Sequence, residues 1–117
     1  MAKTPTIYVN DILDAIRRIE SYTKGMTRAG FGRDKRTQDA VTRCLEIVSE
    51  ASRRVPDSMK SKYPEIPWAK IAGIGNILRH EYRSVSIDAI WQVARSHLAE
   101  LARAVRAMKR ETERPRR

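Results

Sequence analysis

The helical spacing of apolar residues is the feature that most restricts how this chain can fold. Apolar side chains recur every three or four positions in four segments, which predicts helices over residues 10–22, 34–54, 67–82 and 86–108. No segment alternates apolar and polar residues as a half-buried strand does. We therefore expect an all-α fold, an antiparallel bundle of four to five helices joined by short connections.

Capping residues and prolines set the expected helix ends. Asn10 is the expected N-cap of the first helix, and Ser86 that of the last. Pro56 should close the second helix, and Pro67 suits the first turn of the third. The glycine-rich stretch 24–33 has no apolar period, follows no strand and lacks the Gly-Lys-Ser/Thr of a phosphate-binding loop, so we expect a linker there.

The length and the last apolar stripe predict the organisation of the whole chain. A chain of 117 residues fits one domain, and we expect a single helical domain over residues 1–110, followed by a basic tail over 111–117. The stripe of the last helix is longer than three short partner helices should cover. Exposed apolar area of this kind is commonly buried by a second copy, so we expect a homodimer.

Charge and composition indicate the kind of partner and the compartment. The net charge of +10 favours an anionic partner, either nucleic acid or an acidic protein. No apolar run is long enough for a signal peptide or a membrane span, and we expect a cytoplasmic protein without membrane contact. The single cysteine, Cys44, lies on an apolar helix face and cannot form an internal disulfide or a zinc cage.

Polar side chains gather at the end of the third predicted helix, in GIGNILRHEYRS (73–84). Asn76 and His80 are four residues apart and share a helix face, Arg83 follows His80 by three, and Arg79 points about 100° away. Tyr82 lies where the helix should end. These residues by themselves fit either a reactive site or an ordinary helix terminus, since histidine and tyrosine often cap or pack at such positions.

Other candidate residues have simpler explanations. His97 lies on the polar margin of the last helix and is expected to be a surface histidine. The chain offers too few donors at ligand spacing for a metal site, so no metal and no cofactor is expected. Glu46 and Glu50 have the spacing of helix-surface ion pairs, although they could also support an arginine in a neighbouring basic cleft.

Ordered segments of the chain resemble one known family. They are DKRTQDAVTRCLEIVSEA (34–51), KYPEIPW (62–68), IAGIGNILRHEY (71–82) and SIDAIW (86–91). From Ile19 to about Val105 the chain is similar to the HepT-like branch of the HEPN superfamily, which comprises small helical toxins that act beside a minimal nucleotidyltransferase antitoxin. The family motif is an arginine, four residues of any kind, histidine, any residue and tyrosine. His80 and Tyr82 match it, Asn76 fits the asparagine that usually follows the arginine, and Gly75 stands at the arginine position.

The resemblance implies a metal-independent ribonuclease whose cleft is shared between two protomers. His80 would move a proton during attack of the ribose 2′-OH on the adjacent phosphate, with Asn76 and Tyr82 in the same catalytic site. The family arginine would stabilise the growing negative charge, which glycine cannot do. Arg79 and Arg83 could bind the RNA phosphate instead. The resemblance also implies that Tyr82 accepts AMP from the nucleotidyltransferase, and the anionic adduct would fill the cleft.

Two alternatives remain open at the level of the sequence. Because Gly75 replaces the arginine, the chain could be a catalytically inactive helical partner of a nucleotidyltransferase, with Tyr82 as AMP acceptor or as a simple contact. It could also be a basic nucleic-acid-binding module without chemistry, whose binding would fall steeply with salt and would not depend on His80.

Overall fold

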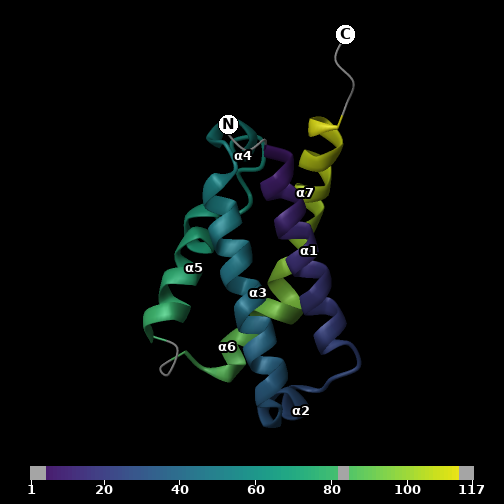
Figure 1. Cartoon of the computed structure of the whole chain (residues 1–117), viewed down its shortest axis with the longest axis vertical. Coiled ribbons are helices and arrows are strands. Elements are labelled where there is room, and N and C mark those ends of the chain that lie inside the picture. Colours follow the sequence, from purple (N-terminus) through teal and green to yellow (C-terminus); the bar gives the residue numbers. More distant parts are fainter. Residues whose placement is uncertain (1–4, 82–84, 114–117) are drawn as a thin grey trace.

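The computed structural model describes residues 5–81 and 85–113. The helices are α1 (Pro5–Thr23), α2 (Arg28–Arg33), α3 (Lys35–Arg54), α4 (Asp57–Lys60), α5 (Trp68–Glu81), α6 (Ile87–Gln92) and α7 (Leu98–Thr112), with the π-helical segment η2 (Val93–His97) joining the last two (Figure 1). Over the described residues there is no strand, which confirms the all-α prediction. None of these helices is both long and apolar enough to cross a membrane.

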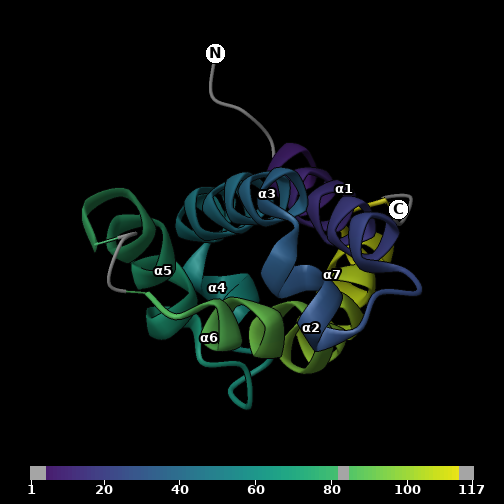
Figure 2. The same ribbon diagram turned by 90° about the horizontal axis from the view of Figure 1, so that it is seen from below.

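The four longest helices run side by side in alternating directions. Figure 1 shows α3 between α1 and α5, with α7 along the other side of α1. Figure 2, seen along the bundle, shows α6 and α7 opposite α3. The core between them is almost entirely aliphatic, and its largest fully buried members include Ile12, Ile16, Ile19, Val41, Ile90, Val105 and Met108, together with one aromatic ring, Phe31. This packing leaves one long side of α5 open.

Helix boundaries agree with the prediction at some ends and differ at others. Ser86 caps α6 by accepting a hydrogen bond from the backbone N–H of Ala89 (3.0 Å), as expected. Asn10 is not a cap, because α1 already begins at Pro5 and Asn10 lies inside it. Pro5 suits a first helical position because its missing N–H has no helical partner there. Val9 is fully buried, so the apolar stripe extends toward the N-terminus beyond the predicted start.

The stretch that we predicted as a linker contains the short helix α2. Thr27 caps it by accepting from the backbone N–H of Gly30 (2.9 Å). Phe31 then enters the core, where its ring centre lies 5.1 Å from that of Trp91. A six-residue helix with one apolar anchor shows no periodicity in the sequence, and only the tertiary contact with Trp91 reveals why it forms.

The last helix is interrupted, and its apolar stripe is covered within one chain. The π-helical segment η2 separates α6 from α7, and the helix changes direction there (Figure 1). The apolar side chains of α7 are buried, including Leu101, Val105 and Met108, and α1 packs along this helix. Our premise that the stripe needs a second copy is therefore wrong. The stripe is covered because α1 is longer than predicted, and the first turns of α1 lie beside the end of α7 (Figure 1).

Candidate functional site

Helix α5 carries the predicted site, and its packing decides which side chains reach solvent. It is positioned by the preceding loop, where the indole N–H of Trp68 donates to the carbonyl of Tyr63 (3.1 Å). Ile71, Gly75 and Leu78 are buried toward the rest of the bundle. Asn76, Arg79 and His80 are exposed. The spacing argument for a polar face on this helix is thereby confirmed.

Gly75 lies in a close contact between α5 and α3. Its backbone N–H donates to the hydroxyl of Ser49 (2.9 Å), and the same hydroxyl donates to the carbonyl of Ala72 (2.9 Å). A Cβ atom at position 75 would lie 2.9 Å from the Ser49 Oγ and 3.1 Å from its Cβ. Position 75 therefore holds no larger residue without movement of Ser49. At Gly73 nothing lies within 4 Å of such an atom, so of these two glycines only Gly75 is in a close contact.

A second side chain of α3 reaches the same part of α5. The Nε–H of Arg53 donates to the carbonyl of Ala72 (2.9 Å), which also accepts from Ser49. The neighbouring Arg54 is bound instead to Glu50, its Nη2 lying 3.3 Å from a carboxylate oxygen. Arg53 remains exposed, so a guanidinium group stands at the surface within one helical turn of Gly75.

Asn76 and His80 are brought together on one exposed side of α5, but the rest of the predicted cluster is only partly visible. His80 lies in the last turn of the helix, one turn beyond Asn76. Tyr82 and Arg83 lie outside the described residues, so their predicted roles stay predictions.

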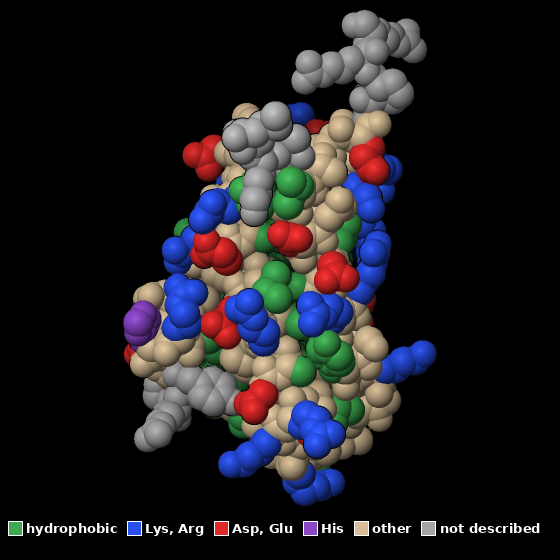
Figure 3. All heavy atoms as spheres, in the orientation of Figure 1, with side chains coloured by type: hydrophobic (Ala, Val, Ile, Leu, Met, Phe, Trp, Pro, Cys, Tyr) green, Lys and Arg blue, Asp and Glu red, His purple; other side chains and the backbone are tan. Residues whose placement is uncertain are grey.

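Arg79 lines a hollow of about 290 Å³ between α1, α3 and α5. The charged side chains around it are Arg43, Arg54 and Arg79 on one hand, and Asp11, Glu46 and Glu50 on the other. Three cations face three anions, so the formal charge of the hollow is balanced. Figure 3 shows the same mixture of blue and red groups over this face. The prediction that Glu46 and Glu50 could support an arginine agrees with this arrangement, while Arg79 has carboxylates around it that compete with a phosphate.

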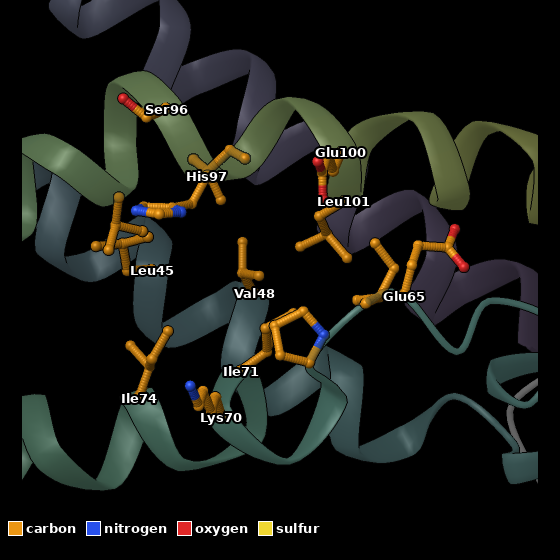
Figure 4. A pocket seen from close by; sticks show the side chains of 14 residues that line it. Leu45, Val48, Glu65, Lys70, Ile71, Ile74, Ser96, His97, Glu100 and Leu101 are labelled. Carbon is orange, nitrogen blue, oxygen red and sulfur yellow. The ribbon is translucent and has the colours of Figure 1, made fainter.

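A separate cavity of about 460 Å³ lies between α3, α5 and η2, away from Asn76 and His80. Leu45, Val48 and Ile71 are part of its apolar lining. Figure 4 shows His97 and Lys70 facing this space from opposite helices. His97 is exposed, as predicted, and its ring borders the cavity rather than pointing away from the bundle.

Metal ligands are not grouped in the part of the chain that the structure describes. Over residues 5–81 and 85–113 no three His, Cys, Asp or Glu side chains lie together in a way that could hold an ion. Cys44 is a buried thiol, and burial raises its pKa above the usual value, which disfavours the reactive thiolate. Its predicted place in the core is confirmed.

Comparisons with known proteins show which family the chain is similar to. Residues 12–108 match the family model "Ribonuclease HepT-like". The chain is 37% identical over 101 residues to "Probable ribonuclease HepT" of Thermococcus cleftensis, covering 86% of this chain and 92% of that protein. It is 33% identical over 104 residues to "Putative RNase TTE0752" of Caldanaerobacter subterraneus subsp. tengcongensis, covering 89% of this chain and 93% of that protein.

A longer relative matches in part. "Gamma-glutamylcyclotransferase and putative RNase MJ0434" of Methanocaldococcus jannaschii is 39% identical over 101 residues, which are 86% of this chain and 46% of that protein. No solved structure matches the chain. The family match, together with the small all-helical fold, places the chain in the HEPN class. With 97 of its residues matched by one family model, the chain belongs to the HepT-like ribonuclease family.

Ser49 and Arg53 are the contacts at this site that sequence reasoning did not identify. Both lie on α3 and make their contacts with α5, 19 to 26 residues further along the chain. A serine on a helix face carries no signal of its own. The glycine at position 75 was the only hint, because an interior helical glycine indicates that another group approaches closely.

Proposed function

We propose that this protein cleaves RNA and is the toxin of a HepT and nucleotidyltransferase toxin–antitoxin pair. The observation that carries the proposal is the exposed His80 on α5, one turn from Asn76, in a chain whose residues 12–108 match a ribonuclease family. Similarity to a protein named as a probable ribonuclease over 92% of its length supports the same reaction. The surplus of ten positive charges favours a polyanionic substrate.

The proposed chemistry needs no group beyond the protein and the RNA. An imidazole can take up and release a proton near neutral pH, so His80 accepts the proton of a ribose 2′-OH. The 2′ oxygen then bonds to the adjacent phosphorus, and the 5′ oxygen of the next nucleotide leaves and takes up a proton. We assign to the amide of Asn76, one turn away on the same helix, the positioning of the reacting phosphate. Tyr82 belongs to the proposed site by the family motif, and Arg83 by its position three residues after His80.

We place this reaction in a cleft formed by two copies of the chain. A single copy presents Asn76 and His80 on an open helix side, where water competes for every hydrogen bond. A second copy over α5 would exclude water and could contribute Arg79 or Arg83 to the phosphate. We thus propose the dimer because the site needs protection from water and an arginine, and no longer because of the apolar stripe of α7.

One matched pair of variants tests the reaction. His80→Ala should lower the rate of RNA cleavage by about 100- to 10,000-fold, the usual range for losing a general acid or base. His97→Ala removes the other histidine of the chain and should leave the rate unchanged. Both variants are measured with EDTA present, since the proposed reaction needs no metal. Cleavage that survives in His80→Ala, or that EDTA abolishes in the unchanged protein, would contradict this mechanism.

A second candidate function follows from Gly75. The contact with Ser49 leaves no room for the charge-stabilising side chain that the family motif has at this position. The chain could therefore be an inactive partner that docks a nucleotidyltransferase, with Tyr82 as AMP acceptor. Co-expression with the nucleotidyltransferase should then add the mass of AMP to the unchanged protein and not to Tyr82→Phe, while purified protein shows no cleavage that depends on His80.

Restoring the motif arginine separates the two candidates, provided that space is made for it. Gly75→Arg alone forces the new Cβ against Ser49, so a loss of stability would obscure its effect on cleavage. The double change Ser49→Gly and Gly75→Arg removes the contacting atoms as it adds the side chain. An active enzyme should become faster by this change, whereas an inactive partner should gain cleavage that was absent before. Ser49→Gly alone is the matched control.

A further inference from the structure

A shallow hollow lies beside the N-terminal half of α5, on the side that Arg53 contacts. Its volume is about 400 Å³, and Pro64, Trp68, Ala69 and Ala72 are part of its lining. Lys60 borders it as well, with its Nζ 5.9 Å from the centre of the Trp68 ring. The indole is held in place by its hydrogen bond to Tyr63. A fixed aromatic ring among small side chains, with a cation nearby, is a surface on which a nucleic-acid base can lie.

Arg53 contacts a residue that borders this hollow, and its guanidinium has donors that this contact does not use. Its Nε–H is used by the carbonyl of Ala72, which itself borders the hollow. A guanidinium carries five N–H donors, so the Nη groups remain for an anion. No ion pair involves Arg53 in the part of the chain that the structure describes, unlike Arg54, which binds Glu50. Arg53 can therefore bind a phosphate through its Nη groups, and the carboxylate of Asp57, which also lines the hollow, lies 3.7 Å from the Nζ of Lys60.

The hollow and the candidate reactive histidine follow each other along the same helix. Ala72, Asn76 and His80 are spaced by four residues, so each step advances about 6 Å and turns by about 40°. Ala72 therefore lies about 12 Å along the axis from His80. Because a stacked strand rises about 3.4 Å per nucleotide, a phosphate at Arg53 would be roughly two to four nucleotides away from one at His80.

We propose that Arg53 and the hollow beside Trp68 form a subsite for one nucleotide of a single-stranded RNA, with the phosphate on Arg53 and the base in the hollow against the Trp68 ring. This subsite rests on the proposed function, because it binds the strand that His80 would cleave. Arg53 supplies a contact with the RNA phosphate backbone that Gly75 cannot make. It holds a neighbouring phosphate and takes no part in the proton transfer.

The test uses binding of a single-stranded 2′-O-methyl oligonucleotide, which lacks the 2′-OH needed for cleavage. Arg53→Gln should weaken binding about tenfold at low salt and reduce the slope of log affinity against log salt by about 0.7, the value for one phosphate contact on a single strand. Arg53→Lys keeps the charge and should keep the slope. Ala69→Leu fills the hollow and should weaken binding roughly tenfold without changing the slope, since a base contact is lost and no charge.

Control variants come from α7, on the other side of the bundle from α5 (Figures 1 and 2). Arg106→Gln and Ala99→Leu make the same changes at exposed positions there and should leave the affinity nearly unchanged. The thermal unfolding midpoint and the oligomeric mass are recorded for every variant. Equal slopes for Arg53→Gln and Arg106→Gln overturn the subsite, and so does a loss of dimer in Ala69→Leu at unchanged RNA affinity.

The failure of this subsite can be told apart from the failure of the proposed function. Cleavage that requires His80, together with binding that is indifferent to Arg53 and Ala69, overturns the subsite alone. Binding with the expected changes in slope, but no cleavage that depends on His80, supports the subsite and overturns the nuclease assignment. A protein that neither binds the oligonucleotide nor cleaves RNA overturns both.

Discussion

At the scale of single residues, Gly75 is where packing and proposed chemistry meet. Its N–H and the carbonyl of Ala72 are both bound by the hydroxyl of Ser49, so two helices are joined through one side chain. The same contact excludes a side chain from the position where the family motif has arginine. A change at either residue should therefore affect stability before it affects any reaction.

Gly75→Ala should destabilise the protein by about 1–3 kcal/mol, because the new methyl group overpacks the contact with Ser49. Gly73→Ala is the matched control on the same helix. Nothing lies near its Cβ position, so the better helix propensity of alanine should stabilise the protein by up to about 1 kcal/mol. Urea unfolding of both variants measures the difference, and equal midpoints would contradict the close contact.

At the scale of elements, side-chain caps fix where the helices begin. Asp34 accepts from the backbone N–H of Thr37 (3.0 Å) and from its hydroxyl (2.8 Å) at the start of α3. Ser86 does the same for α6 with one bond. Both elements carry parts of the site or its support, since α3 holds Ser49 and Arg53, while α6 leads into η2. The caps therefore fix where α3, which carries Ser49 and Arg53, and α6 begin.

Ser86→Ala should lower the free energy of unfolding by about 1 kcal/mol, because the N–H of Ala89 loses its partner. Ser21→Ala, an exposed change inside α1, should have little effect and serves as the control. Thermal or urea unfolding provides the comparison. Identical stabilities of the two variants would show that the cap contributes nothing.

The cap of α3 should make stability depend on pH. The hydrogen bonds from Thr37, backbone first, hold the pKa of Asp34 below its ordinary value. A lowered folded pKa stabilises the protein above the unfolded pKa of about 3.9, and this contribution is lost as the pH falls through the folded value. The difference in urea midpoint between the unchanged protein and Asp34→Ala should thus be full at pH 6 and shrink below about pH 4. Asp14→Ala, at an exposed pair with Arg18, should show a much smaller difference throughout.

At the scale of the whole molecule, the loop before α5 is tied to the end of α7. Glu111 lies 3.1 Å from the Nζ of Lys62 and accepts from the hydroxyl of Tyr63 (3.3 Å). Residues nearly fifty positions apart are thereby joined, and the start of α5 is fixed relative to α7. This contact is exposed, so we expect a modest contribution to stability.

The hydrogen bond between Tyr63 and Glu111 should make the free energy of unfolding depend on pH, and Tyr63→Phe tests this. Burial, and then the charge of Glu111, raise the pKa of Tyr63 above its ordinary value. A raised folded pKa means that the contribution is fully present below the unfolded pKa of about 10 and is lost as the pH rises through the folded value. The unchanged protein should lose stability relative to Tyr63→Phe above about pH 10, measured by unfolding midpoints. A constant difference from pH 8 to 11 would contradict this.

The proposed dimer is also a prediction about the whole molecule. Sedimentation should give twice the chain mass of 13.5 kDa, and the thermal midpoint should rise with protein concentration because association stabilises the folded state. A change to aspartate on the open side of α5, Ile77→Asp, tests whether that side is the contact, since it should favour the monomer if it is. The same change at Ala99 is the control.

The sequence by itself determined that this chain is helical, and where its longest helices lie. The period of Val41, Leu45 and Val48 predicts α3, and Ser86 predicts the start of α6, because periodicity and caps act over a few residues. The cluster around Asn76 and His80 was visible for the same reason, since residues four apart on one helix share a face. Local physics is sufficient for such features.

Only the tertiary structure decided how these helices meet. It covered the stripe of α7 with a longer α1, which removed our first reason for a dimer. It placed Ser49 against Gly75, Arg53 against Ala72, and three carboxylates in the same hollow as Arg79. Each of these contacts joins residues on different helices, and their distances depend on how whole helices pack, which the spacing of residues within one helix does not fix.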